Sequence, residues 1–231
     1  KRFFPDGIRL VNFMGQSGHP ASPHYGEHFG NIWHNLIAPT QPPEGFDGVL
    51  TRDQWRGLVD FSRAVDAHVL TSFAISPGTR NPEGVWTPEV AQRWLDYTRS
   101  VGGEIAAAEF FNEPNVAPMG GAPQGYDAAA YGRDFKVFKE FADQAAPDMA
   151  IVGPSSVGET PGPWAMTYGT SGTIPTADLL AAAGPGGDVF SYHHYDAAAY
   201  GRDFQAFKAF VDQAAPAFFL PPCRRPRRTT R

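Results

Sequence analysis

The sequence predicts an α/β chain built around a parallel sheet, and three observations carry this prediction. Runs typical of strands begin at His68, Ile105, Met149 and Asp188, about 36 to 45 residues apart. Segments with helical spacing precede and separate these runs, so the order from Thr51 onward is α-β-α-β-α-β-α-β. The spacing leaves room for a right-handed crossover helix between neighbouring strands. Both an open doubly wound sheet and a (β/α)8 barrel have this order.

The first helix and strand of the series are predicted between Thr51 and residue 75. Thr51 and Gln54 have the spacing of a capping box, in which two side chains and two backbone N–H groups pair reciprocally at a helix start. The positions that follow recur at helical spacing: Trp55, Leu58, Val59, Ser62 and Val65. Residues 68–75 are rich in β-branched and aromatic side chains, which favours a strand, and the loop at 76–80 follows its carboxyl end.

The second helix and strand are predicted between Thr87 and residue 111. Thr87 is the expected N-cap and Pro88 the expected first-turn residue of a helix that the glycines at 102–103 end. Its buried stripe consists of Val90, Ala91, Trp94, Leu95, Thr98 and Val101. The apolar run at 105–111 is then predicted to be a buried strand.

Two more helix–strand units follow. Asp127 is predicted to cap a helix that Pro147 ends, before a short strand at 149–153. After a long, mostly polar loop, Thr176 is predicted to cap a short helix that reaches Ala183. The last strand of the series is predicted at 188–194.

The remaining segments break the pattern. Residues 1–48 contain one possible strand at 7–13 and no further period, and residues 218–231 form a Pro/Arg-rich tail that we expect to be disordered. Residues 196–217, a near-copy of 127–148, are expected to form a further helix. The text of 126–147 recurs 69 residues later and differs at only 4 of 22 positions. Repeat architectures recur three or more times, so a recent duplication or a faulty join in the gene is the favoured interpretation.

Composition excludes several classes of function. The formal net charge is −5, and five arginines lie in the last eight residues, so the rest of the chain has 14 basic against 24 acidic residues, or −10. Such an acidic body gives no basic face for nucleic acid. Cys223 is the only cysteine, which excludes an intrachain disulfide, and no apolar run reaches the roughly 18 residues of a membrane span. The chain begins at Lys1 rather than methionine, which indicates a processed or partial product.

One short motif suggests a metal site. His24, Glu27 and His28 match the H-x-x-E-H zinc pattern, which needs a helix to bring both imidazoles onto one face. Pro23 and Gly26 oppose a helix there, so loop histidines are the favoured interpretation. We expect no metal and no organic cofactor.

The functional interpretation depends on Asn112-Glu113-Pro114, which follows the run at 105–111. Parallel α/β folds keep their chemistry at the carboxyl ends of strands. Strand alternation puts Glu109 and Glu113 on one face, with Glu109 one layer below, where it could raise the pKa of Glu113 as a general acid requires. In the alternative interpretation, Glu113 caps the following turn and Glu109 pairs with an arginine.

Motifs around Glu113 add a family resemblance. Asn-Glu-Pro after a strand of small residues looks like the acid/base signature of the clan A glycoside hydrolases, which are (β/α)8 barrels. Over about residues 50–195, the text resembles glycoside hydrolase family 79, the β-glucuronidase and heparanase group. The matching stretches are 50–55 (LTRDQW), 71–74 (TSFA), 108–115 (AEFFNEPN), 152–158 (VGPSSVG) and 191–195 (SYHHY). The resemblance implies an incomplete (β/α)8 TIM-barrel-type domain over 49–195.

The same resemblance implies roles for four residues. Glu113 would be the general acid/base at the end of the fourth barrel strand, and Asn112 would contact the sugar 2-hydroxyl or orient the nucleophile. His194 and Tyr195, after the sixth strand, would line the sugar subsite. The implied partner is a carbohydrate that contains glucuronic acid, and the implied location is secreted or extracytoplasmic.

A second carboxylate is the missing part of this assignment. Retaining glycosidases place a nucleophile about 5–5.5 Å from the acid/base. The family takes it from the seventh strand, which has no visible counterpart here, and Glu159 matches a loop position instead. We therefore expect a barrel fragment with weak or absent hydrolysis. The alternatives are a non-catalytic carbohydrate-binding fragment that uses Trp86, Trp164 and Tyr168, and a poorly folded product whose open sheet edges favour aggregation.

Overall fold

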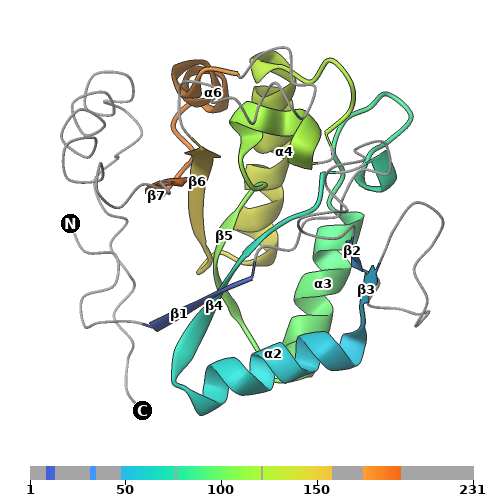
Figure 1. The fold of residues 1–231 in the computed structure, drawn as a ribbon, viewed down its shortest axis with the longest axis vertical. Helices are drawn as coiled ribbons and strands as arrows, with labels where there is room; N and C mark the ends of the chain where they lie inside the picture. Colours follow the sequence, from blue (N-terminus) through green and yellow to red (C-terminus); the bar gives the residue numbers. More distant parts are fainter. Residues whose placement is uncertain are drawn as a thin grey trace.

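A computed structural model describes residues 9–13, 32–34, 48–75, 77–120, 122–157 and 174–193. The largest element is a five-stranded sheet in the order β1-β4-β5-β6-β7, with every neighbouring pair parallel (Figure 1). Its strands are β1 (Arg9–Phe13), β4 (Ala67–Ser72), β5 (Ile105–Glu109), β6 (Ala150–Val157) and β7 (Val189–His193). Two further strands, β2 (Ile32–His34) and β3 (Gly48–Leu50), pair with each other in parallel.

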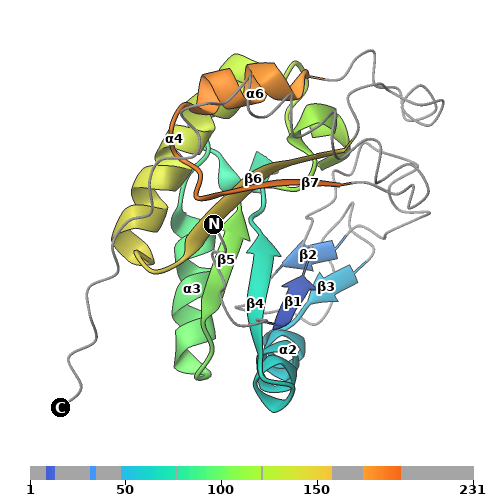
Figure 2. The same cartoon turned by 90° about the vertical axis from the view of Figure 1, so that its left-hand side faces the viewer.

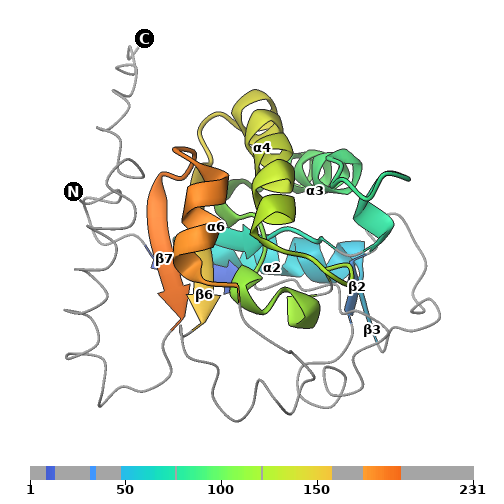
Figure 3. The same ribbon diagram turned by 90° about the horizontal axis from the view of Figure 1, so that it is seen from above.

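The helices lie on one face of the five-stranded sheet. They are α2 (Arg52–Ala64), α3 (Glu89–Ser100), α4 (Ala128–Ala145) and α6 (Thr176–Ala183), and the short 3-10 helices are η1 (Pro77–Thr79) and η2 (Pro114–Gly120). Figure 2 shows α3, α4 and α6 along the same side of the strands, and Figure 3 shows α6 beside β6 and β7. In the described ranges, no helix has the length and apolar character that crossing a bilayer requires.

The position of the hydrophobic core distinguishes the open doubly wound sheet from the (β/α)8 barrel, the two architectures that the order of elements allows. The core joins the sheet to side chains from all four helices, including Trp55 of α2, Trp94 of α3, Phe138 of α4 and Leu179 of α6. A doubly wound sheet carries helices on both faces. The described elements therefore form part of a (β/α)8 barrel, which confirms the expected incomplete TIM-barrel-type fold.

Two of the predicted helix caps are confirmed. Gln54 N donates to Thr51 Oγ1 at 3.2 Å and Thr51 N donates to Gln54 Oε1 at 2.8 Å, which completes the capping box of α2. At the start of α4, Asp127 Oδ1 accepts from Ala130 N at 2.8 Å. These side chains satisfy backbone N–H groups that have no partner inside the helix.

The predicted caps of α3 and α6 are wrong. Pro88 and Pro175 occupy the N-cap positions, and neither helix start has a side-chain cap bond. Thr87 lies one residue before the cap, and its hydroxyl donates instead to Thr79 O at 3.2 Å. Thr176 is the first residue of α6 and is fully buried.

Strand lengths also differ from expectation. β5 ends at Glu109 rather than at residue 111, because Phe110 and Phe111 both turn into the core instead of alternating between faces. β6 continues to Val157, four residues beyond the predicted end at 153. Within residues 1–48, the possible strand at 7–13 corresponds to β1, whereas β2 carried no recognisable signal.

The core is dominated by aromatic rings. Phe110 lies between Trp86 and Phe138, with ring centroids 5.5 and 5.1 Å away. Trp55 and Trp94 pack edge to face at 4.8 Å and join α2 to α3. Such pairs each add about 0.5–1.5 kcal/mol beyond the burial of their area. This packing fixes the end of β5, and with it the start of the loop that carries Glu113.

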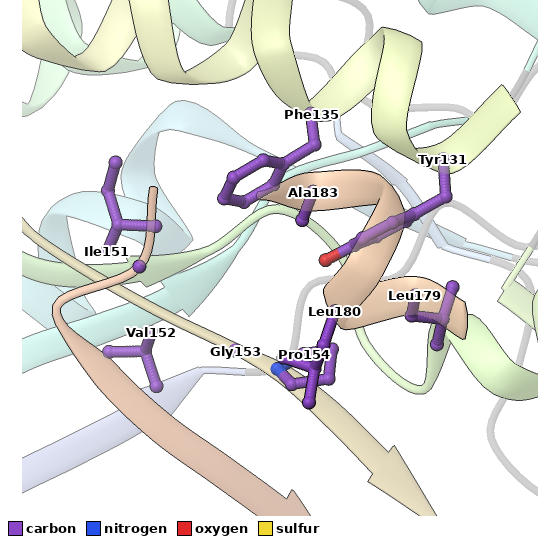
Figure 4. A pocket seen from close by; sticks show the side chains of 10 residues that line it. Tyr131, Phe135, Ile151, Val152, Gly153, Pro154, Leu179, Leu180 and Ala183 are labelled. Atoms are coloured by element: carbon purple, nitrogen blue, oxygen red, sulfur yellow. The ribbon is translucent and has the colours of Figure 1, made fainter. Parts of the chain in front are cut away.

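A small apolar crevice lies between α4, α6 and β6 (Figure 4). Its lining consists of Tyr131, Phe135, Ile151, Val152, Gly153, Pro154, Leu179, Leu180, Ala183 and Gly187. The Tyr131 hydroxyl is the side-chain oxygen that Figure 4 shows there, and burial raises the pKa of this phenol. The crevice thus offers no group for acid/base chemistry and belongs to the packing of α4 and α6 on the sheet.

Candidate functional site

The stretch after β5 places Glu113 at the carboxyl edge of the sheet. Phe110 and Phe111 anchor this stretch in the core at 2% and 3% exposure, and Glu113 then takes a positive φ of 52°. A non-glycine residue in this conformation costs of order 1–3 kcal/mol and persists where the surrounding structure fixes it. Here the Val116 N–H donates to Glu113 O at 2.9 Å, which closes the turn. The Glu113 side chain remains 16% exposed.

His193, the last residue of β7, meets Glu113 across the sheet edge. Its Nδ1 lies 2.7 Å from Glu113 Oε1, and its side chain is 18% exposed. Burial disfavours the charged imidazole, but the hydrogen bond and charge of Glu113 outweigh burial and raise the pKa of His193. The two residues therefore form an ion pair when the imidazole is protonated.

Glu109, the last residue of β5, lies beneath this pair at 3% exposure. The Ser72 hydroxyl donates to Glu109 Oε1, and Ser155 is a second hydrogen-bond partner. Burial raises the pKa of Glu109, while the two serines and the charge of His193 act against burial. Glu109 thus has serine partners, and the alternative interpretation, in which Glu109 pairs with an arginine, is wrong.

Two asparagines flank Glu113 and differ in their contacts. Asn112 is 5% exposed, and its Oδ1 has no hydrogen-bond partner among the described residues. Asn115 is 1% exposed, its Nδ2 donates to Val157 O at 2.7 Å, and its Oδ1 accepts from Val157 N at 3.0 Å. Asn115 O also accepts from Ile174 N at 2.8 Å. Asn115 therefore has a structural role, whereas Asn112 retains an unused acceptor beside Glu113.

Some predicted residues are not brought into this site. His194, Tyr195 and Glu159 lie outside the described residues, as does the H-x-x-E-H motif. Trp86 is 1% exposed, and its Nε1 donates to Ala74 O at 2.9 Å, so the alternative in which Trp86 binds sugar is wrong. Within the described ranges, no three His, Cys, Asp or Glu side chains gather as a metal site would require.

The sequence interpretation missed His193. It named the next two residues of the same motif and left this one without a role. Period-two alternation puts Ser191 and His193 on the same face of β7, and Ser191 Oγ lies 2.6 Å from Ser155 Oγ. The alternation was therefore a usable signal, but only once the position of the strand was known.

Comparisons with known proteins give a fold likeness. No protein-family model and no curated protein sequence matches the chain. A glycoside hydrolase family 26 endo-beta-1,4-mannanase from Bacillus sp. JAMB-750 is 14% identical, with a TM-score of 0.44 over 71% of this chain and 48% of that chain. The family 53 catalytic domain from Ignisphaera aggregans is 15% identical, with a TM-score of 0.45 over 82% of this chain and 49% of that chain.

A third solved structure has similar values. The family 44 endoglucanase from Clostridium acetobutylium is 11% identical, with a TM-score of 0.46 over 84% of this chain and 50% of that chain. The chain spans about half the length of these three structures. At such identities and TM-scores the similarity concerns the fold, and the chemistry must be inferred from the site residues.

Proposed function

We propose that the chain carries the acid/base half of a retaining glycoside hydrolase site, with Glu113 as the general acid/base. The observation that carries the proposal is the Glu113 carboxyl group, 16% exposed at the carboxyl edge of a parallel sheet and held 2.7 Å from His193. Side chains in this position perform the chemistry in barrel enzymes. The Asn112 Oδ1, which has no hydrogen-bond partner among the described residues, is suited to accept a hydrogen bond from a sugar hydroxyl.

The proposed chemistry needs two carboxylates. Protonated Glu113 donates its proton to the glycosidic oxygen as a nucleophile attacks the anomeric carbon, and its carboxylate then activates water. Among the described residues, Glu109 is the carboxyl group coupled to Glu113, and at 3% exposure it cannot reach a sugar. We therefore expect weak or absent hydrolysis unless a nucleophile is supplied.

The proposed substrate class is an aryl or glycan β-glucuronide. This choice rests on the family 79 resemblance over about residues 50–195, which assigns His194 and Tyr195 to the sugar subsite. Both residues enter the proposal as subsite contacts, and Asn112 as the contact to the 2-hydroxyl. A single set of aryl β-glycosides that differ only in the sugar would test this choice.

Added azide gives a direct test, because an external anion can replace a missing nucleophile. Azide attacks the anomeric carbon of phenyl β-glucuronide, the bond to the phenolic oxygen breaks, and Glu113 protonates that oxygen. We expect azide-dependent release of phenol and formation of the α-glucuronyl azide. Glu113→Gln should lower this rate by about 10²–10⁴, the usual contribution of general acid catalysis.

The control is Glu140→Gln, which removes an exposed carboxylate from α4 and should leave the rate unchanged. A 2,4-dinitrophenyl leaving group needs no proton, so its azide-dependent release should depend much less on Glu113. Azide-dependent release that is equal in wild type and Glu113→Gln for the phenyl substrate would overturn the assignment of Glu113.

A second candidate function is carbohydrate binding without cleavage. The observation that favours it is the burial of Glu109, the carboxyl group that acts on Glu113 among the described residues, at 3% exposure. Saturable oligosaccharide binding, no product with or without azide, and equal affinity in Glu113→Gln would support binding over catalysis.

A further inference from the structure

A chain of polar side chains crosses four neighbouring strands beneath the candidate site. β4 contributes Ser72, β5 Glu109, β6 Ser155 and β7 Ser191. The Ser72 hydroxyl donates to Glu109 Oε1, Ser155 bonds to Glu109, and Ser155 Oγ lies 2.6 Å from Ser191 Oγ. The first three residues are at most 3% exposed, so water does not compete for these bonds.

This polar chain lies directly below the Glu113–His193 pair. Ser191 precedes His193 by two residues on the same face of β7, and Glu109 closes β5 four residues before Glu113. Charge on Glu109 interacts with both Glu113 and His193. The protonation state of Glu109 therefore decides whether one or two negative charges face the imidazole.

The neighbours of Glu109 favour the neutral acid. Among the described residues, the charged and titratable groups that act on it or respond to it are Glu113, after β5, His193 on β7, and the Tyr131 phenol on α4. One imidazolium faces two carboxyl groups, and it already pairs with Glu113 at 2.7 Å. An ionised carboxylate that is buried without its own cation costs several kcal/mol.

The hydrogen bonds fit a protonated carboxyl. Glu109 accepts from the Ser72 hydroxyl, and its own O–H can donate to Ser155 Oγ, whose hydroxyl can then donate to Ser191 Oγ. Each hydroxyl in the sequence donates once in this arrangement. A carboxylate can accept from both serines but has no proton to donate, so burial of the charge would remain uncompensated.

We propose that Glu109 is a positioning residue that stays protonated in the folded protein, ties β4 to β6 beneath the site, and adds no second negative charge to that of Glu113 beside His193. Its relevance to catalysis rests on the proposed function of Glu113. The protonation of Glu109 and its structural role do not depend on that function, so both can be tested without an assay of turnover.

The first test is the titration of the His193 imidazole, followed by NMR in the full chain with labelled histidine and assigned with His193→Gln. Glu113→Gln should shift the His193 midpoint to lower pH, because it removes the facing carboxylate. Glu109→Gln, which replaces a neutral acid by a neutral amide, should leave the midpoint unchanged. A shift to lower pH in Glu109→Gln as well would overturn the proposal, because it would show that Glu109 carries a charge.

The second test reads the Glu109 proton in the wild-type protein and does not depend on a variant that folds. Infrared spectra near neutral pH should contain a C=O band of a protonated carboxyl that persists in Glu113→Gln and is removed by Glu109→Gln. A wild-type spectrum without the band would contradict the proposal. If the chain showed no azide-dependent turnover while the NMR and infrared results were as expected, only the proposed catalytic function of Glu113 would be contradicted. The protonation of Glu109 would still hold.

Rescue by the conservative variant separates positioning from mere packing. Glu109→Gln keeps one donor and one acceptor for the serines, whereas Glu109→Ala removes both and leaves a cavity. We expect cooperative unfolding close to wild type in the first variant and a clear drop in the thermal midpoint in the second. An equal drop in both would overturn the positioning role.

Discussion

Arg80 Nη1 lies 2.6 Å from Asp134 Oδ2, and the two side chains are 3% and 0% exposed. The pair joins the loop after β4 to the middle of α4, and Tyr126 donates to the same oxygen at 3.1 Å. Removal of one partner from a buried pair leaves an uncompensated charge. Asp134→Asn should therefore lower the free energy of unfolding by about 3–5 kcal/mol, measured by chemical denaturation.

The same helix provides the control for that experiment. Asp143 pairs with Lys139 at 2.6 Å, but its side chain is 58% exposed. Exposed pairs contribute about 0–1 kcal/mol, so Asp143→Asn should have a small effect. Equal losses in Asp134→Asn and Asp143→Asn would show that burial of the Arg80 pair does not matter.

The Glu113–His193 contact predicts a pH-dependent stability. The folded protein raises the pKa of His193 above its unfolded value, so the stabilisation is fully present below the unfolded pKa, about 6.5. It is lost as pH rises through the folded pKa. The thermal midpoint of wild type should exceed that of Glu113→Gln at about pH 5.5, and the difference should shrink by about pH 9.

Neutralisation of a different carboxylate serves as the control for this pH profile. Glu140 is exposed on α4, so Glu140→Gln should show the same midpoint difference from wild type at both pH values. If the midpoint difference in Glu113→Gln were independent of pH, the ion pair would not contribute to stability.

Alanine substitutions of two helical glycines should change the stability of the protein in opposite directions. A Cβ on Gly132 of α4 would lie 2.8 Å from Ala182 Cβ of α6, whereas a Cβ on Gly57 of α2 would meet nothing within 4 Å. Gly132→Ala should destabilise the protein by about 1–3 kcal/mol because α4 and α6 must separate. Gly57→Ala should stabilise it by up to about 1 kcal/mol through helix propensity. A stabilising Gly132→Ala would contradict the close packing of the two helices.

Substitution of the two asparagines beside Glu113 should distinguish an effect on stability from an effect on function. Asn115→Ala leaves the partly buried N–H and C=O of Val157 without their Asn115 partners, which should cost up to about 1–3 kcal/mol for each group. Asn112→Ala removes an oxygen with no partner among the described residues, so its cost should be smaller. Chemical denaturation and azide-dependent turnover of both variants check this.

We expect the larger loss of stability in Asn115→Ala and a loss that mainly affects turnover in Asn112→Ala. Asn112→Ala should reduce azide-dependent turnover more than it reduces stability, since its oxygen is proposed to hold the sugar. If Asn112→Ala instead destabilised the protein as much as Asn115→Ala and left turnover unchanged, Asn112 would be a structural residue.

Local rules were sufficient to predict much of the fold. Thr51 and Asp127 follow the capping rules because their bonds reach only three residues along the chain. The rules failed at Thr87 and Thr176, where a proline next to the threonine occupies the cap position. β5 was predicted too long because an apolar run does not reveal whether Phe111 alternates or turns inward.

The site was less accessible to sequence reasoning. The position of Glu113 at the sheet edge follows from the strand before it, but its contact with His193 spans 80 residues. The polar chain beneath it depends on the order β4-β5-β6-β7, which no local pattern encodes. Serine at positions 72, 155 and 191 carries no distinctive signal, so its alignment with Glu109 emerges only from the folded sheet.

Asn115 holds two points of the chain that are far apart in sequence, Val157 through its side chain and Ile174 through its carbonyl oxygen. Asn115 thus couples the turn after Glu113 to the end of β6 and to the residue before the N-cap of α6. Local opening of one of these three segments must break a bond to another, so we expect their amide hydrogens to exchange with solvent as one cooperative unit.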